Sequence, residues 1–135
     1  MAQEMVLGTF DAETAGGVMS PGFVAISSRV TAQHAIDGLR LVARDAETMA
    51  YVYVVDELER LLGVLSFHDL VYADPRAPVG ATMVTDVVRV SADTSSADAA
   101  SMLRDSGLLA LPVVDASDRM LGLLTLDDIV DLLDA

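Results

Sequence analysis

The segment RLLGVLS at positions 60–66 returns, slightly changed, as RMLGLLT at positions 119–125, 59 residues further along the chain. Upstream of each copy stands VVD, at 54–56 and again at 113–115, with the same offset. Segments that restate one another in the same order identify an internal duplication. Such a duplication decides the architecture before any single element is considered.

The openings of the two copies match as well, since residues 18–26 align with residues 82–90 at an offset of 64. This offset is five larger than the one downstream, so the first copy carries five extra residues. We expect this insertion between its first helix and its next strand, around Val42 to Met49.

Each copy has the same expected order of elements: a short strand, a helix, two strands joined by a polar turn, and a closing helix. We expect Thr31 to be the N-cap of the helix in the first copy, and either Ser95 or Ser96 to be the N-cap of the helix in the second. Gly107 is expected to end that second helix in the left-handed conformation. Period-two and apolar β-branched runs predict strands at 24–26, 51–55, 62–65, 111–114 and 121–124, and helical spacing predicts closing helices at 67–73 and 126–133.

The sequence therefore predicts an α/β (α+β) fold of two β-α-β-β-α repeats. Domains near 60 residues are marginal alone, so we expect the repeats to pack sheet to sheet with pseudo-two-fold symmetry. The expected organisation is a linker or disordered N-terminus at 1–14, repeat 1 at 15–78 and repeat 2 at 79–135.

Composition excludes several classes of function. The formal net charge is −13 at pH 7 and all basic residues are scattered arginines, which argues against nucleic-acid binding. There is no cysteine, so disulfides and thiolate chemistry are excluded. The charge-free stretches 14–28 and 106–114 are too broken or too short for a membrane span, and the N-terminus does not resemble a secretion signal. We expect a cytoplasmic protein.

Catalysis is not expected. The two histidines, His34 and His68, lie in helical patterns with no nucleophile or orienting group evidently placed beside them.

The strand-to-helix junctions GVLSFHDL at 63–70 and GLLTLDDI at 122–129, with Met19 and Met83 opening the copies, resemble paired CBS domains, which form a Bateman module. The segments AGGVMSP at 15–21, YVYVVDE at 51–57 and ADPR at 73–76 are most similar to the cytosolic CBS region of MgtE-family magnesium transporters. This resemblance implies a regulatory module that senses Mg²⁺ and an adenine nucleotide, forms a homodimer and acts on a magnesium channel membrane domain.

The CBS resemblance implies that the acid of G-x-x-[S/T]-x-x-D bonds ribose while the hydroxyl residue contacts phosphate. The same spacing is a variant capping box, so both interpretations stay open. Tyr51 is among the aromatic residues that could stack an adenine. The expected nucleotide-binding residues are Phe23, Tyr53, Ser66, Asp69, Pro112, Thr125 and Asp128.

In the MgtE family, magnesium bridges acidic surfaces. Mg²⁺ keeps several waters and needs only one or two carboxylates, so a loose acidic surface suffices. The alternative is that these acids are solvated surface charges. The expected metal-binding residues are Glu57, Glu59, Asp69, Asp74, Asp93 and Asp98.

Two other functions remain open at this point. One is a free-standing energy sensor that binds AMP or ATP, and the other is a ligand-free scaffold that dimerises its host.

Overall fold

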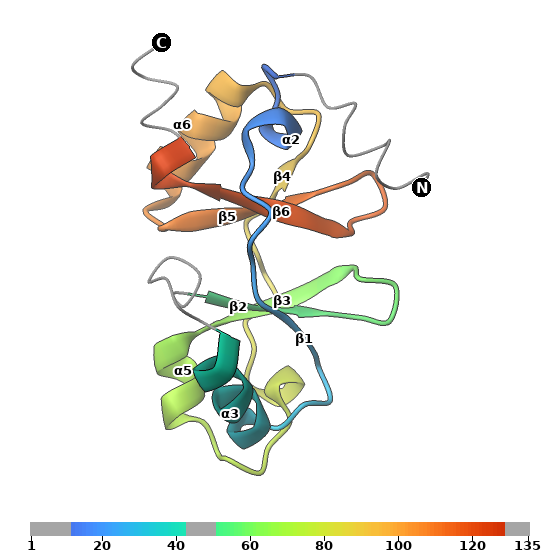
Figure 1. Cartoon of the computed structure of the whole chain (residues 1–135), viewed down its shortest axis with the longest axis vertical. Helices are drawn as coiled ribbons and strands as arrows, with labels where there is room; N and C mark the ends of the chain where they lie inside the picture. The colour runs from blue at the N-terminus through green and yellow to red at the C-terminus, as the bar shows by residue number, and fades with distance from the viewer. Residues whose placement is uncertain (1–11, 43–50, 129–135) are drawn as a thin grey trace. The chain divides into compact units, whose positions relative to one another are not determined.

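The computed structural model describes residues 12–42 and 51–128, which fall into two compact units (Figure 1). The first unit comprises residues 22–87, and the second joins residues 12–21 to residues 88–128. Each unit holds one three-stranded sheet, ordered β1-β2-β3 in the first and β4-β5-β6 in the second. The mixed α+β class predicted from the duplication is therefore confirmed.

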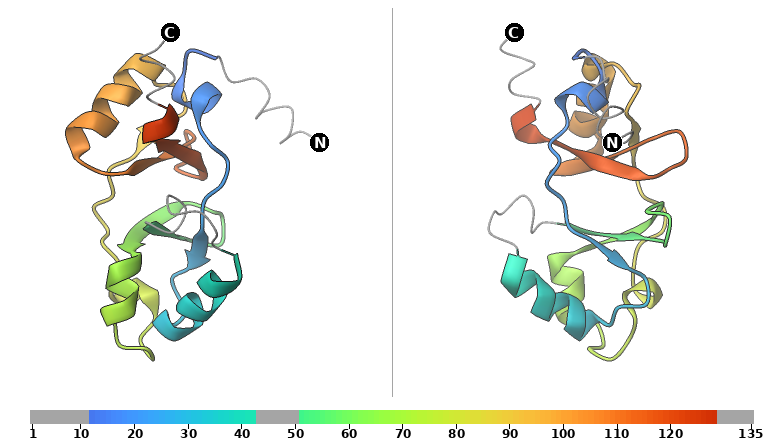
Figure 2. Two further views of the ribbon diagram at one scale, coloured as in Figure 1. Left: turned by 60° about the vertical axis from the view of Figure 1, so that its left-hand side comes forward. Right: turned by 45° about the vertical axis from the view of Figure 1, so that its right-hand side comes forward.

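The first unit contains β1 (Ala25–Ser27), α3 (Ala32–Val42), β2 (Tyr51–Val55), β3 (Leu61–Ser66), α5 (Phe67–Tyr72) and the 3-10 turn η1 (Val79–Ala81). Strand β1 runs parallel to β2, and β3 runs antiparallel to β2. Helices α3 and α5 lie on the same side of this sheet (Figure 2). The Thr31 hydroxyl caps α3 by accepting a hydrogen bond from the His34 N–H at 3.1 Å, as the sequence predicts.

The alternation of side chains gives this sheet two different faces. Val52, Val54 and Leu65 belong to the hydrophobic core that the helices cover. Because successive residues of a strand point to opposite faces, Tyr51 and Ser66 lie on the other face of the sheet. The remaining buried core residues are Ala32, Ala35, Leu39, Leu70 and Val79.

The second unit repeats this plan with α2 (Ala15–Val18), β4 (Val90–Ser91), α6 (Ser96–Ser106), β5 (Ala110–Val114) and β6 (Met120–Thr125). Ser95 caps α6, and Gly107 ends it with a φ of 71°, as predicted. Its core residues are Ala15, Val90, Ala92, Ala99, Leu103, Leu111, Val113 and Leu124.

The opening segments of the two copies cross over between the units. Ser20 belongs to the opening segment of the first repeat, yet its backbone pairs with Leu123 of β6, at N–O distances of 2.7 and 2.8 Å. Val84, in the opening segment of the second repeat, pairs in the same way with Val64 of β3, at 3.0 and 2.9 Å. Each sheet is thus completed by the segment that opens the other copy, a topology that the repeat boundaries in the sequence do not reveal.

Three expected features lie partly or wholly outside the described residues. Helices α3 and α6 each have 11 residues, so the five extra residues of the first copy fall between α3 and β2, within the undescribed range 43–50. Of the closing helix predicted at 126–133, residues 126–128 are helical and the rest is not described. The expected linker at 1–14 is described only from residue 12.

Candidate functional site

The junction between β3 and α5 forms a complete capping box. The Ser66 hydroxyl accepts a hydrogen bond from the Asp69 N–H at 3.0 Å, and Asp69 Oδ2 accepts one from the Ser66 N–H at 3.1 Å. The helix-capping interpretation of this motif is therefore correct. It leaves the Ser66 hydroxyl hydrogen available to donate, and the Asp69 side chain stays at the exposed surface.

The matching aspartate of the second unit is held much more tightly. Asp128 Oδ2 accepts hydrogen bonds from the Thr125 N–H at 2.8 Å and from the Thr125 hydroxyl at 3.0 Å. The Ser20 hydroxyl donates to Asp128 Oδ1 at 3.3 Å as well. Asp128 is partly buried, and Thr125 is only 4% exposed. The two carboxylates predicted to bind ribose are therefore not equivalent.

The pairing register brings an aromatic ring to the first junction. Tyr51 is the direct partner of Ser66 across β2 and β3, so both side chains lie on the sheet face away from the helices. Tyr51 also faces Tyr53, with ring centroids 6.4 Å apart and a tilt of 57°. At the same position of the second unit, Ala110 pairs with Thr125, and no aromatic ring is present there.

The other expected nucleotide-binding side chains are less accessible. Tyr53 is 2% exposed, Pro112 is fully buried in β5, and Phe23 is half-buried before β1. Burial, followed by the neighbouring Tyr51, raises the pKa of Tyr53, so its hydroxyl stays protonated at neutral pH. Of the two tyrosines of β2, Tyr51 is the less buried.

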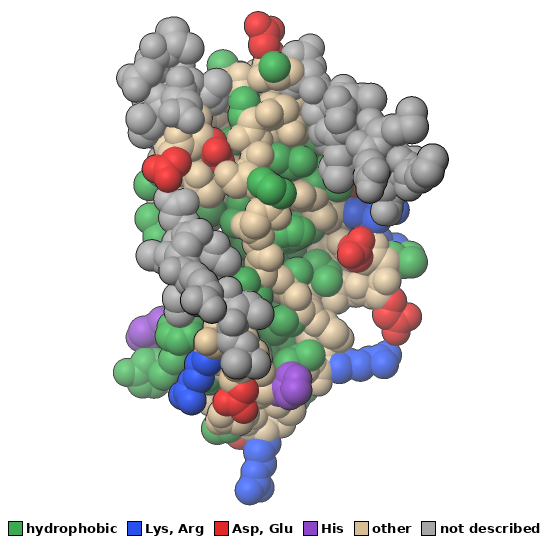
Figure 3. All heavy atoms as spheres, in the orientation of Figure 1, with side chains coloured by type: hydrophobic (Ala, Val, Ile, Leu, Met, Phe, Trp, Pro, Cys, Tyr) green, Lys and Arg blue, Asp and Glu red, His purple; other side chains and the backbone are tan. Residues whose placement is uncertain are grey.

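The expected metal ligands are dispersed. Among residues 12–42 and 51–128, no three Asp, Glu or His side chains lie close enough together to hold a metal ion. On the face shown in Figure 3, acidic side chains lie at several places and do not form one continuous patch. Their places are a hairpin for Glu57 and Glu59, the capping box for Asp69, the loop after α5 for Asp74, the loop after β4 for Asp93 and the first turn of α6 for Asp98.

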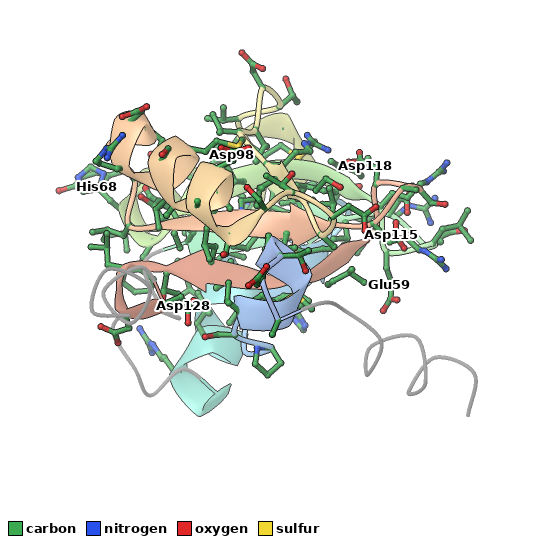
Figure 4. All side chains as sticks on the ribbon, turned by 90° about the horizontal axis from the view of Figure 1, so that it is seen from above. Glu59, His68, Asp98, Asp115, Asp118 and Asp128 are labelled. Atoms are coloured by element: carbon green, nitrogen blue, oxygen red, sulfur yellow. The ribbon has the colours of Figure 1, made fainter. Side chains whose placement is uncertain are left out.

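The Asp74 carboxylate is already hydrogen-bonded to the backbone, and the Asp98 N–H donates to the cap of its own helix. Asp74 Oδ1 accepts a hydrogen bond from the Arg76 N–H at 3.0 Å. The Asp98 N–H donates to the hydroxyl of Ser95, the N-cap of α6, at 3.2 Å. Glu59 occupies the left-handed conformation with a φ of 67°, as Asp118 does in the second hairpin. Figure 4 shows Asp115 and Asp118 at one end of the second sheet and Asp128 at the other. Within each unit, therefore, these acids do not form a shared metal centre.

Two residues of this candidate site were left out of the expected set. Tyr51 was weighed as a stacking residue but not included in the site, although its two-residue spacing from Tyr53 places both rings on one face. Ser20 was not considered, because its contact with Asp128 spans 108 positions. The offset of 64 aligns Ser20 with Val84, which contains no hydroxyl. This difference between the copies was the feature of the sequence that could have pointed to Ser20.

None of the helices in the described part of the chain has the length and apolar character that a membrane span requires.

Comparison with known proteins agrees with this architecture. The CBS domain model matches residues 15–76 and 79–135. The magnesium transporter MgtE of Thermus thermophilus is 42% identical over 134 residues, covering 99% of this chain and 30% of the transporter. The chain thus spans about a third of that relative.

Solved structures give the same result. The cytosolic domain of the Mg²⁺ channel MgtE in complex with ATP superimposes with a TM-score of 0.88 at 42% identity, covering 97% of this chain and 53% of that one. CBSX2 in complex with AMP has a TM-score of 0.72 at 25% identity, covering 89% of this chain and 95% of that one. The chain belongs to the CBS domain family, and its tandem pair is a regulatory module related to the cytosolic part of the MgtE magnesium transporters.

Proposed function

We propose that this chain is the cytosolic sensing part of a magnesium-transport system, and that it binds an adenine nucleotide at the first junction. The observation that carries the nucleotide proposal is the register pair of Tyr51 and Ser66 beside the capped, exposed Asp69. The relatives crystallised with ATP and with AMP support this ligand class.

Each residue has a distinct role in this proposal. The Tyr51 ring stacks on the adenine, an interaction that aromatic residues provide to any base. The Asp69 carboxylate accepts hydrogen bonds from the ribose hydroxyls, and the Ser66 hydroxyl donates to a phosphate oxygen. The capping box fixes Ser66 and Asp69 before the nucleotide arrives, so little conformational freedom is lost on binding.

The second junction is the poorer candidate. Ala110 stands where Tyr51 does, and the Asp128 carboxylate already accepts from Thr125 and Ser20. A ribose there would have to compete with these internal donors.

The stacking role is tested by Tyr51→Ala, with ATP affinity measured by isothermal titration calorimetry. We expect affinity to fall about tenfold, because stacking of one base contributes roughly 1–3 kcal/mol. The matched control is Tyr72→Ala at the far end of α5, where Tyr72 is 77% exposed and contacts His68. Equal affinity in Tyr51→Ala and the unaltered protein would reject this residue as the stacking platform.

Mg²⁺ sensing is the second part of the proposal, and the charge of −13 supports it. Carboxylates that face one another between two copies of the chain, or between it and an attached domain, repel until a divalent cation neutralises them. The dispersed acids at positions 57, 59, 69, 74, 93 and 98 suit such bridging better than a site within one unit. We propose a homodimer whose geometry responds to Mg²⁺ and acts on a magnesium channel membrane domain.

Thermal melting across a MgCl₂ series at constant ionic strength tests this part. At about 100 times its dissociation constant, Mg²⁺ should stabilise the protein by roughly 2.7 kcal/mol, which raises Tm by several degrees. Asp93→Asn with Asp98→Asn should raise Tm without Mg²⁺ and reduce the Mg²⁺ response, because less repulsion remains to be neutralised.

Controls with NaCl and CaCl₂ separate specific binding from screening. A shift reproduced by NaCl would contradict Mg²⁺ sensing. If Tm responds to ATP alone, the remaining function is a free-standing energy sensor. If Tm responds to neither ligand, the remaining function is a dimerisation scaffold.

A further inference from the structure

The first unit has a pocket at the opposite end of its sheet from Asp69. Its volume is about 270 Å³, and it lies where β1 ends and where the hairpin joins β2 to β3. Its lining residues are Ser27, Ser28, Arg29, Val55, Asp56, Glu57, Leu58 and Arg60. This size suits a small ligand rather than a whole nucleotide.

Two arginines, Arg29 and Arg60, line this pocket. Arg29 is 86% exposed, and its nearest acid is Glu57 at 3.8 Å, which is itself 88% exposed. An ion pair this long and this exposed contributes little, so Arg29 can exchange Glu57 for another anion. Arg60 donates from Nε to Asp56 Oδ2 at 2.7 Å, which uses one of the five N–H donors of its guanidinium group.

Hydroxyl groups and a short apolar wall complete the pocket. Ser27 Oγ accepts from the Arg29 N–H at 3.3 Å, so its own hydrogen remains a donor. The Ser28 carbonyl accepts from the Gly80 N–H at 3.0 Å, which fixes this loop to η1. Val55 and Leu58 supply the apolar surface.

The two acidic residues of the pocket, Asp56 and Glu57, differ in how strongly they would repel a bound anion. The Asp56 carboxylate is compensated, because it accepts from the N–H groups of Leu58 and Arg60, both at 2.9 Å, in addition to Arg60 Nε. Among the residues that the structure describes, Glu57 has only the long contact with Arg29. Its exposed side chain is able to turn into solvent when a stronger anion reaches Arg29.

We propose that this pocket binds a small phosphate monoester, with Arg29 and Arg60 as the cationic ligands and the hydroxyls of Ser27 and Ser28 as donors. Two guanidinium groups and two hydroxyls match the several acceptor oxygens of a phosphate group. The duplication makes the pocket specific to the first copy. At the offset of 64, Ala92 replaces Ser28 and Asp93 replaces Arg29, which reverses the charge.

The test is a titration of the ¹⁵N-labelled chain with glycerol 3-phosphate and, separately, with inorganic phosphate, followed by NMR at constant ionic strength. We expect saturable amide shifts confined to residues 27–29 and 55–60. Arg29→Gln should weaken binding about tenfold through loss of a charge-assisted hydrogen bond. Asp69→Ala should not alter it, because Asp69 lies at the other end of the sheet; this separates the pocket from the nucleotide proposal.

The matched control is Arg104→Gln, which removes the same charge from an exposed arginine of α6, 72% exposed beside Asp105. Retained affinity in this variant, with loss in Arg29→Gln, supports the pocket. Equal loss in both variants would show diffuse charge attraction and overturn the proposal, as would the lack of any saturable shift. Stronger binding of the monoester than of inorganic phosphate would extend the site to the organic part of the ligand.

Discussion

Asp69 and Asp128 occupy the same place in the two copies, yet one neighbouring residue makes them different. The opening segment presents Ser20 to Asp128, where the other opening segment has Val84. A hydroxyl satisfies part of the second carboxylate, whereas a valine offers no donor to the first. Both copies therefore keep the hydrogen bond from the Ser66 or Thr125 N–H to the aspartate, while the first carboxylate is exposed and the second is partly buried.

Asp56 and Asp115 fix the two hairpin turns and should make stability depend on acid. A hydrogen bond from the Arg60 backbone is the main cause that lowers the pKa of Asp56. Partial burial opposes the shift at Asp115, but hydrogen bonds from Arg119 and Ser117 outweigh it and lower that pKa as well.

When the pKa of an aspartate is lower in the folded state than in the unfolded state, its ionisation stabilises the fold. This stabilisation is complete at pH values well above the pKa of the unfolded state, which is about 3.9 for aspartate. This stabilisation is present at neutral pH and is lost as the pH falls below about 4. We expect Tm to drop over this range, and the drop to be smaller in Asp56→Asn with Asp115→Asn. Tm measured from pH 6 to pH 2.5 checks this.

The control for the acid prediction is Asp37→Asn, at an exposed aspartate of α3 outside both turns. Its pH profile should follow that of the unaltered protein. If the turn variants and this control lose stability in parallel, the turn aspartates are not the cause of the acid sensitivity.

A glycine in β3 and a glycine in β6 allow the opening segments to pack closely against these strands. A Cβ on Gly63 would lie 2.5 Å from Met83 Sδ and 2.9 Å from the Val84 carbonyl oxygen. At Gly122 it would lie 2.7 Å from the Ser20 carbonyl oxygen. Because the nearby backbone is held by strand pairing, it has little room to move.

We expect Gly63→Ala to destabilise the protein by about 1–3 kcal/mol, the usual cost of overpacking. Chemical denaturation measures this directly. Gly38→Ala is the matched control, since Gly38 lies in α3 with no atom within 4 Å of an added Cβ, and alanine there should stabilise by about 0.5–1 kcal/mol. Equal stability of Gly63→Ala and the unaltered protein would contradict the close approach.

Local sequence patterns predicted the helices and strands well, because these elements depend on nearby residues. Tyr51–Val55 was predicted at its observed bounds, and α5 ends one residue before the predicted Ala73. The crossing of the opening segments depends on contacts far apart in the sequence, so periodicity could not reveal it. The pocket at Arg29 was missed for the same reason, because it joins the end of β1 to a hairpin beyond α3 and β2.

The two copies of the module therefore have different chemistry despite a common fold. The first copy has Tyr51 and an exposed Asp69 at one end of its sheet and the arginine pocket at the other. The second has Ala110 and the internally bonded Asp128. These differences favour the first copy for both proposed ligands.

The most direct test of this account compares Asp69→Ala with Asp128→Ala by calorimetric titration with ATP. Both variants lose the aspartate of a helix-start motif, so each controls for the other's loss of capping. We expect ATP affinity to fall at least about tenfold in Asp69→Ala and to change less than about twofold in Asp128→Ala. Full affinity in Asp69→Ala, or an equal or larger loss in Asp128→Ala, would contradict the assignment of the nucleotide to the first copy.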